Sequence, residues 1–150
     1  MSALLTFDDS LWPLAIIRLS GVMTNGQLEE FLARSSALLA RGEPYVCITD
    51  LRSAGVPSIE QCRRLSEWID ANHAPLRERV LCTAVLVNSA PLRLSMSLIF
   101  HLKPQPMPHR AVPDMTSALQ FALDKFREAG LVSDAERIQR HFAAPDSHVG

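Results

Sequence analysis

The chain has 150 residues, of which 47% are apolar and 21% charged, and its net charge at pH 7 is −1. These values are typical of one soluble globular domain and exclude a disordered or fibrous chain. The 15 Lys and Arg residues form no basic run, no apolar stretch reaches the roughly 18 residues of a membrane span, and the N-terminus lacks a signal peptide. We therefore expect a cytoplasmic protein that binds no nucleic acid.

The first predicted elements are two strands and a helix. The segments Ala3–Phe7 and Leu14–Leu19 are rich in Leu and Ile, and Asp8-Asp9-Ser10 between them predicts the turn of a hairpin. The sequence T-N-G-Q from Thr24 is a capping box, and the apolar stripe that follows predicts a helix that ends at Gly42.

The next stretch is the centre of the functional prediction. An apolar run from Tyr45 ends at Asp50, which is typical of a buried strand in an α/β domain. A second capping box, Ser58-Ile59-Glu60-Gln61, starts a helix that Ala74-Pro75 should close. The loop between them should lie at the carboxyl edge of the sheet, where α/β proteins usually bind ligands and partners.

The second half of the chain begins with a continuous apolar run, Val80–Val87, which predicts a strand covered on both faces. The segment Leu92–Leu102 alternates like a strand but also carries a helical stripe, and we favour a helix because the chain has just left a strand through Ser89 and Pro91. Such a helix would carry a second apolar stripe that is either buried or offered to a partner: Leu94, Leu98 and Leu102.

The last elements complete one domain. The proline-rich segment Lys103–Pro108 predicts a connecting loop, and His109–Val112 predicts a short final strand. Asp114 should cap the following helix, and a short terminal helix comes after it. We assign residues 1–142 to a single domain and residues 143–150 to a flexible polar tail.

The three cysteines, Cys47, Cys62 and Cys82, form no C-x-x-C pair and have no histidine at metal-ligand spacing. Two lie in apolar strand-like runs and one on the apolar stripe of a helix. We therefore expect inert core thiols, and we predict neither a metal site nor a cofactor.

The order β-β-α-β-α-β-α-β-α plus a terminal helix, with a buried strand ending in Asp50-Leu51 before a capped helix, resembles the STAS domain of bacterial anti-sigma-factor antagonists. The resemblance covers roughly Ser2 to Ala129 and extends to uncharacterised bacterial STAS-like proteins. It implies a single α/β domain with a mixed sheet of about five strands, helices packed mainly on one face, and an extra C-terminal helix. It also implies a non-enzymatic signalling protein that acts by protein-protein interaction.

In the antagonists, a D-S-S-G motif at the start of the second helix carries a serine that a partner kinase phosphorylates. Aligned without gaps from Asp50-Leu51, this motif falls on Ser58-Ile59-Glu60-Gln61 and matches at no position. The regulatory serine is therefore not carried over. Ser53 and Ser58 are the hydroxyls in the corresponding neighbourhood, and both are retained as sites of regulatory phosphorylation, although Ser58 already has a structural role as a helix cap.

A receiver-like phospho-accepting domain is one alternative. Its acidic pair, phospho-accepting aspartate, hydroxyl and lysine would be Asp8, Asp9, Asp50, Ser89 and Lys103. The order of elements opposes this reading, because a receiver needs a helix directly after the acidic pair, where this sequence predicts a strand.

Two further alternatives concern small molecules. An enzyme would use Asp50 and Asn88 at two strand ends, but neither has a base or nucleophile nearby in the sequence. A pocket for an apolar ligand would be lined by Trp68, Met96 and Phe100, which core packing explains equally well.

The sequence therefore predicts a regulatory or scaffold module without catalytic residues. Its partner would be another protein or a second copy of the chain, bound through the loop and start of the second helix with help from the helix at Leu92–Leu102. The predicted interface residues are Asp50, Arg52, Leu94, Leu98 and Leu102.

Overall fold

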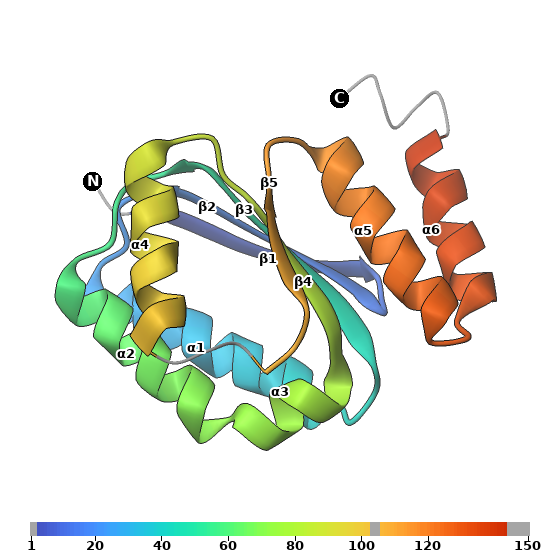
Figure 1. Cartoon of the computed structure of the whole chain (residues 1–150), viewed down its shortest axis with the longest axis horizontal. Coiled ribbons are helices and arrows are strands. Elements are labelled where there is room, and N and C mark those ends of the chain that lie inside the picture. Colours follow the sequence, from blue (N-terminus) through green and yellow to red (C-terminus); the bar gives the residue numbers. More distant parts are fainter. Residues whose placement is uncertain (1–2, 103–105, 144–150) are drawn as a thin grey trace.

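The computed structural model describes residues 3–102 and 106–143, without the side chains of residues 100–102. In that part of the chain, a five-stranded sheet lies between two layers of helices (Figure 1). The strands are β1 (Leu4–Leu11), β2 (Leu14–Gly21), β3 (Tyr45–Ala54), β4 (Val80–Leu86) and β5 (His109–Val112). The helices are α1 (Asn25–Ala40), α2 (Ile59–Ala71), α3 (His73–Arg79), α4 (Ala90–Leu102), α5 (Met115–Glu128) and α6 (Val132–Ala143).

The sheet is mixed, as predicted, and its strands follow the chain order from β1 to β5. β1 pairs with β2 in antiparallel fashion, and β2, β3, β4 and β5 are parallel neighbours. The carboxyl ends of the parallel strands therefore lie at one edge of the sheet, and the loops that lead into α1, α2 and α4 leave from that edge.

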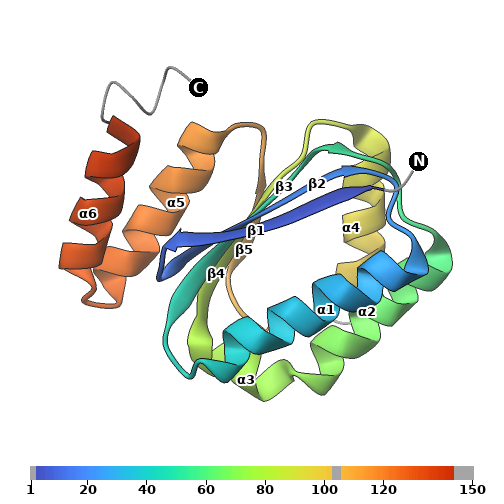
Figure 2. The same cartoon turned by 180° about the vertical axis from the view of Figure 1, so that it is seen from behind.

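The helices divide between the two faces of the sheet. Helices α1 to α4 lie on one face, and α5 and α6 lie on the other, which Figure 2 shows from behind. Four of the six described helices thus share a face, in agreement with the prediction. Because side chains alternate along a strand, Val46 and Ile48 of β3 enter the core under α5 and α6, while Tyr45 enters the core under the other helices.

Both predicted capping boxes are confirmed. Thr24 Oγ1 accepts a hydrogen bond from the Gln27 amide at 3.1 Å, and Gln27 Oε1 accepts one from the Thr24 amide at 2.9 Å. Ser58 and Gln61 form the same reciprocal pair at 3.1 and 3.0 Å. These bonds satisfy amides that a helix start otherwise leaves unpaired, so the local sequence fixes where α1 and α2 begin.

The predicted hairpin turn was wrong. The strand β1 continues to Leu11, and Trp12-Pro13, joined by a cis peptide bond, forms the turn. The Asp8 carboxylate accepts hydrogen bonds from the amide and hydroxyl of Ser10 at 2.9 and 2.7 Å. These local bonds accompany a shift of register between Asp8 and Leu11, so the polar cluster forms a bulge within the strand and not a chain reversal.

Two further boundaries differ from the prediction. β3 runs past Asp50 to Ala54 because β2 also extends, and Ser20 and Gly21 pair with Ser53 and Ala54. The helix α3 was not predicted, since a proline was expected to end helical structure. Pro75 is the third residue of α3, within the first turn, where a helix does not need the amide that proline lacks.

The later elements follow the prediction. The ambiguous segment Leu92–Leu102 is part of helix α4, and β5 spans the predicted residues. Asp114 caps α5, because its carboxylate accepts a hydrogen bond from the Ser117 amide at 2.8 Å. Ala143, the first residue of the predicted tail, is the last residue of α6, while Lys103 and residues 144–150 lie outside the described residues. No helix in the described part of the chain combines the length and hydrophobicity that crossing a membrane requires.

The cysteines are free thiols. Cys62 and Cys82 are buried as predicted, and Cys47 is half-buried. Burial raises the pKa of Cys47 to about 11 and that of Cys82 to about 12, and it also raises the pKa of Cys62. Little thiolate therefore exists at neutral pH, so these residues are poor nucleophiles.

Candidate functional site

Three exposed apolar side chains gather at the carboxyl edge of the sheet. Val22, Val56 and Ile59 expose 57%, 48% and 68% of their surface, and we call them the loop patch. Val22 follows β2, while Val56 and Ile59 belong to the β3–α2 loop and the first turn of α2. Such a group of exposed apolar residues, rather than a single one, is a feature of interaction surfaces.

The two loops that carry the patch are held together at Gly55. The Gly55 amide donates a hydrogen bond to the Gly21 carbonyl at 2.8 Å. A Cβ atom on Gly55 would lie only 2.3 Å from Val22 Cγ2, so the backbone of one loop packs directly against the side chain of the other. The two loops therefore pack against each other and present the loop patch as one surface.

Ile59 was not among the residues that the sequence analysis selected, although a signal for it exists. The buried side of α2 includes Cys62 and Ile69, and Ile59 is the exposed first residue of the helix. An apolar residue in the polar first turn, outside the buried stripe, does not pack in the core and therefore indicates an exposed apolar surface. Val56 carries the same signal within the loop.

Helix α4 presents a second exposed apolar surface. Leu94 and Leu98 are exposed by 71% and 39%, whereas Leu92 and Ile99 on the same helix are buried. The helix therefore has one buried and one exposed apolar side, as its two stripes predicted. The side chain of Leu102, the third predicted residue of the exposed stripe, lies outside the described residues.

Asp50 and Arg52 form an ion pair on the other face of the sheet. Asp50 continues the row of Val46 and Ile48, which faces α5 and α6. Its Oδ1 accepts hydrogen bonds from the amide and Nε of Arg52 at 3.1 and 3.0 Å, and its Oδ2 accepts one from Nη2 at 2.9 Å. The structure thus separates these two predicted interface residues from Leu94 and Leu98, which belong to the layer on the opposite face.

Because of this ion pair, the stability of the fold should depend on pH. Hydrogen bonds from the Arg52 side chain lower the pKa of Asp50, with a further contribution from the Arg52 backbone amide. A carboxyl whose pKa is lower in the folded state stabilises the fold above its unfolded pKa, and this stabilisation is lost as pH falls through the folded pKa. Asp50→Asn should therefore destabilise the protein at pH 7 by about 1 kcal/mol or less, and the difference from the parent should shrink below about pH 4.

Urea unfolding at a series of pH values would measure this difference. The same Asp50→Asn change in an Arg52→Gln background is the control, because the partner that lowers the pKa is then absent. A difference between parent and Asp50→Asn that stays constant from pH 7 to pH 3 would contradict the account.

The two predicted phosphorylation sites are both exposed but differ in their surroundings. Ser53 lies in β3 opposite Ser20, whereas Ser58 caps α2. Ser89, the hydroxyl of the receiver-like alternative, accepts a hydrogen bond from the Leu92 amide at 3.3 Å at the start of α4.

The receiver-like arrangement is not formed. A strand and not a helix follows Asp8 and Asp9, and β2 separates them from β3, which carries Asp50. Its lysine, Lys103, lies outside the described residues. Within residues 3–102 and 106–143, no group of three or more His, Cys, Asp or Glu side chains is arranged to hold a metal ion.

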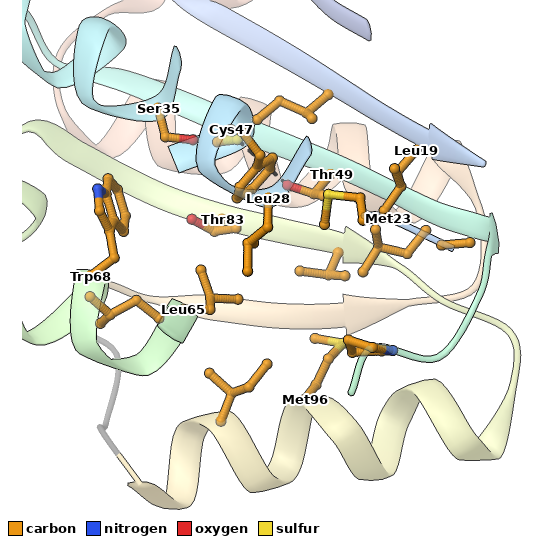
Figure 3. Close-up of a pocket in the computed structure, with 18 of the residues that line it drawn as sticks. Leu19, Met23, Leu28, Ser35, Cys47, Thr49, Leu65, Trp68, Thr83 and Met96 are labelled. Atoms are coloured by element: carbon orange, nitrogen blue, oxygen red, sulfur yellow. Dashed lines mark hydrogen bonds between the residues drawn. The ribbon is translucent and has the colours of Figure 1, made fainter. Parts of the chain in front are cut away.

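A cavity of about 200 Å³ lies between the sheet and helices α1, α2 and α4. Trp68 and Met96, two of the three residues predicted to line an apolar pocket, border it; the side chain of Phe100 is outside the described residues. Figure 3 shows Trp68 and Leu65 on one side of the cavity, Met96 below, and Thr49 and Thr83 on the sheet above them. Cys47 also borders it, which explains why this thiol is only half-buried.

Gln61 joins the cavity to the loop patch. The residue is 7% exposed, and its side chain borders the cavity and forms the capping bond to Ser58. Its Nε2 donates to the Met23 carbonyl at 2.8 Å and lies 3.3 Å from Asn25 Oδ1. One buried amide therefore links the start of α2 to the β2–α1 loop and the start of α1.

The five-stranded mixed sheet in chain order, with an antiparallel first strand and helices on both faces, gives the chain an α/β fold. The chain superposes on the crystal structure of an anti-sigma factor antagonist from Mycobacterium paratuberculosis with a TM-score of 0.57 and 15% identity, over 81% of this chain and 94% of that one. An uncharacterized DUF3478-family protein from Shewanella loihica with a SpoIIAA-like fold matches with a TM-score of 0.55 and 12% identity, over 81% and 93%. No family model matches the chain, and no curated protein matches it significantly. The comparisons thus confirm the predicted resemblance at the level of the fold.

Proposed function

We propose that the protein is a non-enzymatic regulatory module that binds a partner protein through the loop patch and the N-terminus of α2. The observation that carries this proposal is the exposure of Val22, Val56 and Ile59 on loops that are fixed against each other at Gly55. A partner that covers these side chains would remove apolar surface from water without having to order the loops first. The likeness of the fold to an anti-sigma factor antagonist supports a partner-binding role.

The exposed side of α4 extends the proposed surface. Helices α2 and α4 belong to the same layer, and Ser66 Oγ of α2 lies 3.5 Å from the Ile99 carbonyl of α4. Leu94 and Leu98, with Leu102, are therefore proposed to contact either the partner or a second copy of the chain. Asp50 and Arg52 are also proposed to contact the partner. They would do so as an ion pair on the opposite face of the sheet, where the Arg52 side chain is 38% exposed.

The absence of catalytic chemistry is part of the proposal. Asp50 is engaged by Arg52 through three hydrogen bonds, which leaves it a weak base. Asn88 lies exposed in the β4–α4 loop. Its side-chain amide is neither an acid nor a base at neutral pH. The raised pKa values of the cysteines also disfavour nucleophilic catalysis.

Phosphorylation of Ser58 would offer a way to regulate such a surface. A phosphate there would place negative charge between Val56 and Ile59 and would oppose an apolar contact. It would also remove the hydroxyl from its capping position. The positive end of the helix dipole would tolerate the phosphate, whereas Glu60, the acidic residue in the first turn of α2, would oppose it. Ser53 is the second proposed site.

Affinity capture from the native cells, followed by mass spectrometry, tests the proposal. The Val56→Glu/Ile59→Glu variant should lose its partner by at least tenfold relative to the parent, because each carboxylate would be desolvated in the contact. Val132→Glu is the matched control, since Val132 at the start of α6 is 47% exposed, as Val56 is 48% exposed.

Mass spectrometry of the captured protein would also detect phosphate on Ser53 and Ser58. Light scattering of the Leu94→Glu/Leu98→Glu variant would measure self-association. Retention of the full set of captured proteins by the Val56→Glu/Ile59→Glu variant would refute the proposed surface. The Leu94→Glu/Leu98→Glu variant could have the same mass as the parent in light scattering and could capture the same partners. That result would exclude α4 from the interface.

A further inference from the structure

The cavity between the sheet and helices α1, α2 and α4 is large for a domain of this size. Protein interiors are packed about as densely as organic crystals, and voids that exceed one water molecule are few. This cavity holds about 200 Å³, and the core on the other face of the sheet is closed by residues such as Phe126 and Ile138, which are fully buried. The space is therefore a local feature of one face.

The side chains that line the cavity determine which kind of ligand it can bind. None of the described residues that line the cavity is Asp, Glu, Lys, Arg or His. A charged molecule would lose its hydration there without gaining a compensating charge, so the walls select against ions. Trp68, Leu65 and Met96 supply apolar surface, and the flexible thioether of methionine adapts to different shapes.

A few polar groups interrupt the apolar surface. Thr49 and Thr83 project from neighbouring strands of the sheet toward the cavity (Figure 3). Thr49 Oγ1 lies 3.6 Å from Cys47 Sγ, a weak hydrogen bond that leaves the hydroxyl able to make another. These hydroxyls could orient one polar group of an otherwise apolar molecule.

The volume limits the size of the occupant. A dry cavity of about 150 Å³ is large enough to bind benzene. The present cavity therefore suits one ring with a short alkyl chain, or an aliphatic chain of comparable volume. It is partly open to solvent, and the loop residues Met23, Gly55 and Pro57 belong to its lining.

From the volume, the uncharged walls and the two threonine hydroxyls, we propose that this cavity is a binding site for a small, uncharged, predominantly apolar molecule. The lining of the cavity differs from the loop patch, since it includes none of Val22, Val56 and Ile59.

Fluorescence titration with n-butylbenzene tests the proposal. The chain has two tryptophans, and Trp12→Phe leaves Trp68 as the sole reporter. Trp12→Phe keeps an aromatic ring against Tyr45 and removes an indole nitrogen that has no hydrogen-bond partner within the described residues. We expect a saturable change of Trp68 emission with one site per chain. 4-Phenylbutyrate, which has a similar length but carries a carboxylate, should bind at least tenfold more weakly.

Variants locate the site. Thr83→Phe should fill the cavity and abolish the signal, whereas Thr6→Phe, the same change at an exposed strand position, should leave it unchanged. Ser95→Phe on α4 is a second filling variant if Thr83→Phe does not fold, as judged by circular dichroism. Ile59→Glu should still bind butylbenzene, which separates this site from the loop patch.

Two results would overturn the inference. One is a parent protein that shows no saturable binding of n-butylbenzene. The other is a folded Thr83→Phe or Ser95→Phe variant that binds the probe as tightly as the parent does. Neither result would bear on the proposed partner surface, because the capture experiment measures that surface separately.

Discussion

Replacing Phe126 with alanine is expected to lower the free energy of unfolding by about 3 to 5 kcal/mol. Phe126 lies in α5, is fully buried, and is the largest such side chain in the described part of the chain. It packs in the core between the sheet and α5 and α6, together with Ile48 and Ile138. Truncation would remove its apolar surface and leave a cavity that these rigid neighbours could only partly fill.

Chemical denaturation at pH 7 measures the effect. Phe142→Ala is the matched control, because Phe142 packs against the same core but is only partly buried, and its loss should be clearly smaller. If both variants lost the same free energy, or if Phe126→Ala lost less than about 1 kcal/mol, the proposed core between the sheet and α5 would be wrong.

Replacing Gln61 with glutamate is expected to cost about 2 to 3 kcal/mol at neutral pH, although the two side chains have nearly the same shape. The Nε2 group of Gln61 donates to the Met23 carbonyl, and a carboxylate would place a second acceptor there. Gln61 is only 7% exposed, so water has little access to replace the lost donor. The loss should become smaller at acidic pH, where the protonated glutamate can donate a hydrogen bond again.

The corresponding change in the other capping box is the control for Gln61. Gln27 caps α1 in the same reciprocal manner, but its side chain is only half-buried. Gln27→Glu should therefore cost less than Gln61→Glu in urea unfolding, since a carboxylate at position 27 stays partly hydrated. Gln27 Nε2 donates in the same way to the Ala3 carbonyl, so equal losses for the two variants would contradict the role of burial. A loss at Gln61 that does not depend on pH would show that the Gln61–Met23 bond does not hold the loops together.

Local signals in the sequence predicted most of the secondary structure. Thr24, Ser58 and Asp114 each satisfy helix amides with their own side chains, so the information for the start of a helix is contained in four neighbouring residues. The order of elements that follows from these starts was sufficient to identify the fold. The segment Leu92–Leu102 was assigned correctly from its position after Pro91, where its own periodicity was ambiguous.

The errors arose where distant segments decide the structure. β3 extends to Ala54 only because β2 supplies a pairing partner up to Gly21, and nothing near Asp50 signals this. The turn at Trp12-Pro13 was missed because the Asp8–Ser10 cluster has the composition of a turn but forms hydrogen bonds within a bulge. In both cases, the competing structures differ in tertiary pairing and not in local propensity.

The candidate site was only partly predictable for the same reason. The sequence indicated the β3–α2 loop, but the contact of Gly55 with Val22 joins residues more than thirty positions apart. Trp68 and Met96 were named as pocket residues only in an alternative reading, because core packing explained them equally well; the structure places both at the cavity. The direction of Asp50 depends on the alternation along β3, which places it opposite to the helix layer that carries Leu94.

The measurement that most directly tests the proposed partner surface is site-specific photocrosslinking in the native cells. A photoreactive amino acid at position 56 should form a covalent adduct with the partner protein, whereas the same amino acid at position 132, which is equally exposed, should not. Adding Ile59→Glu should abolish the adduct at position 56. Adducts of the same protein from both positions, or no adduct at position 56 while capture still recovers the partner, would contradict the account.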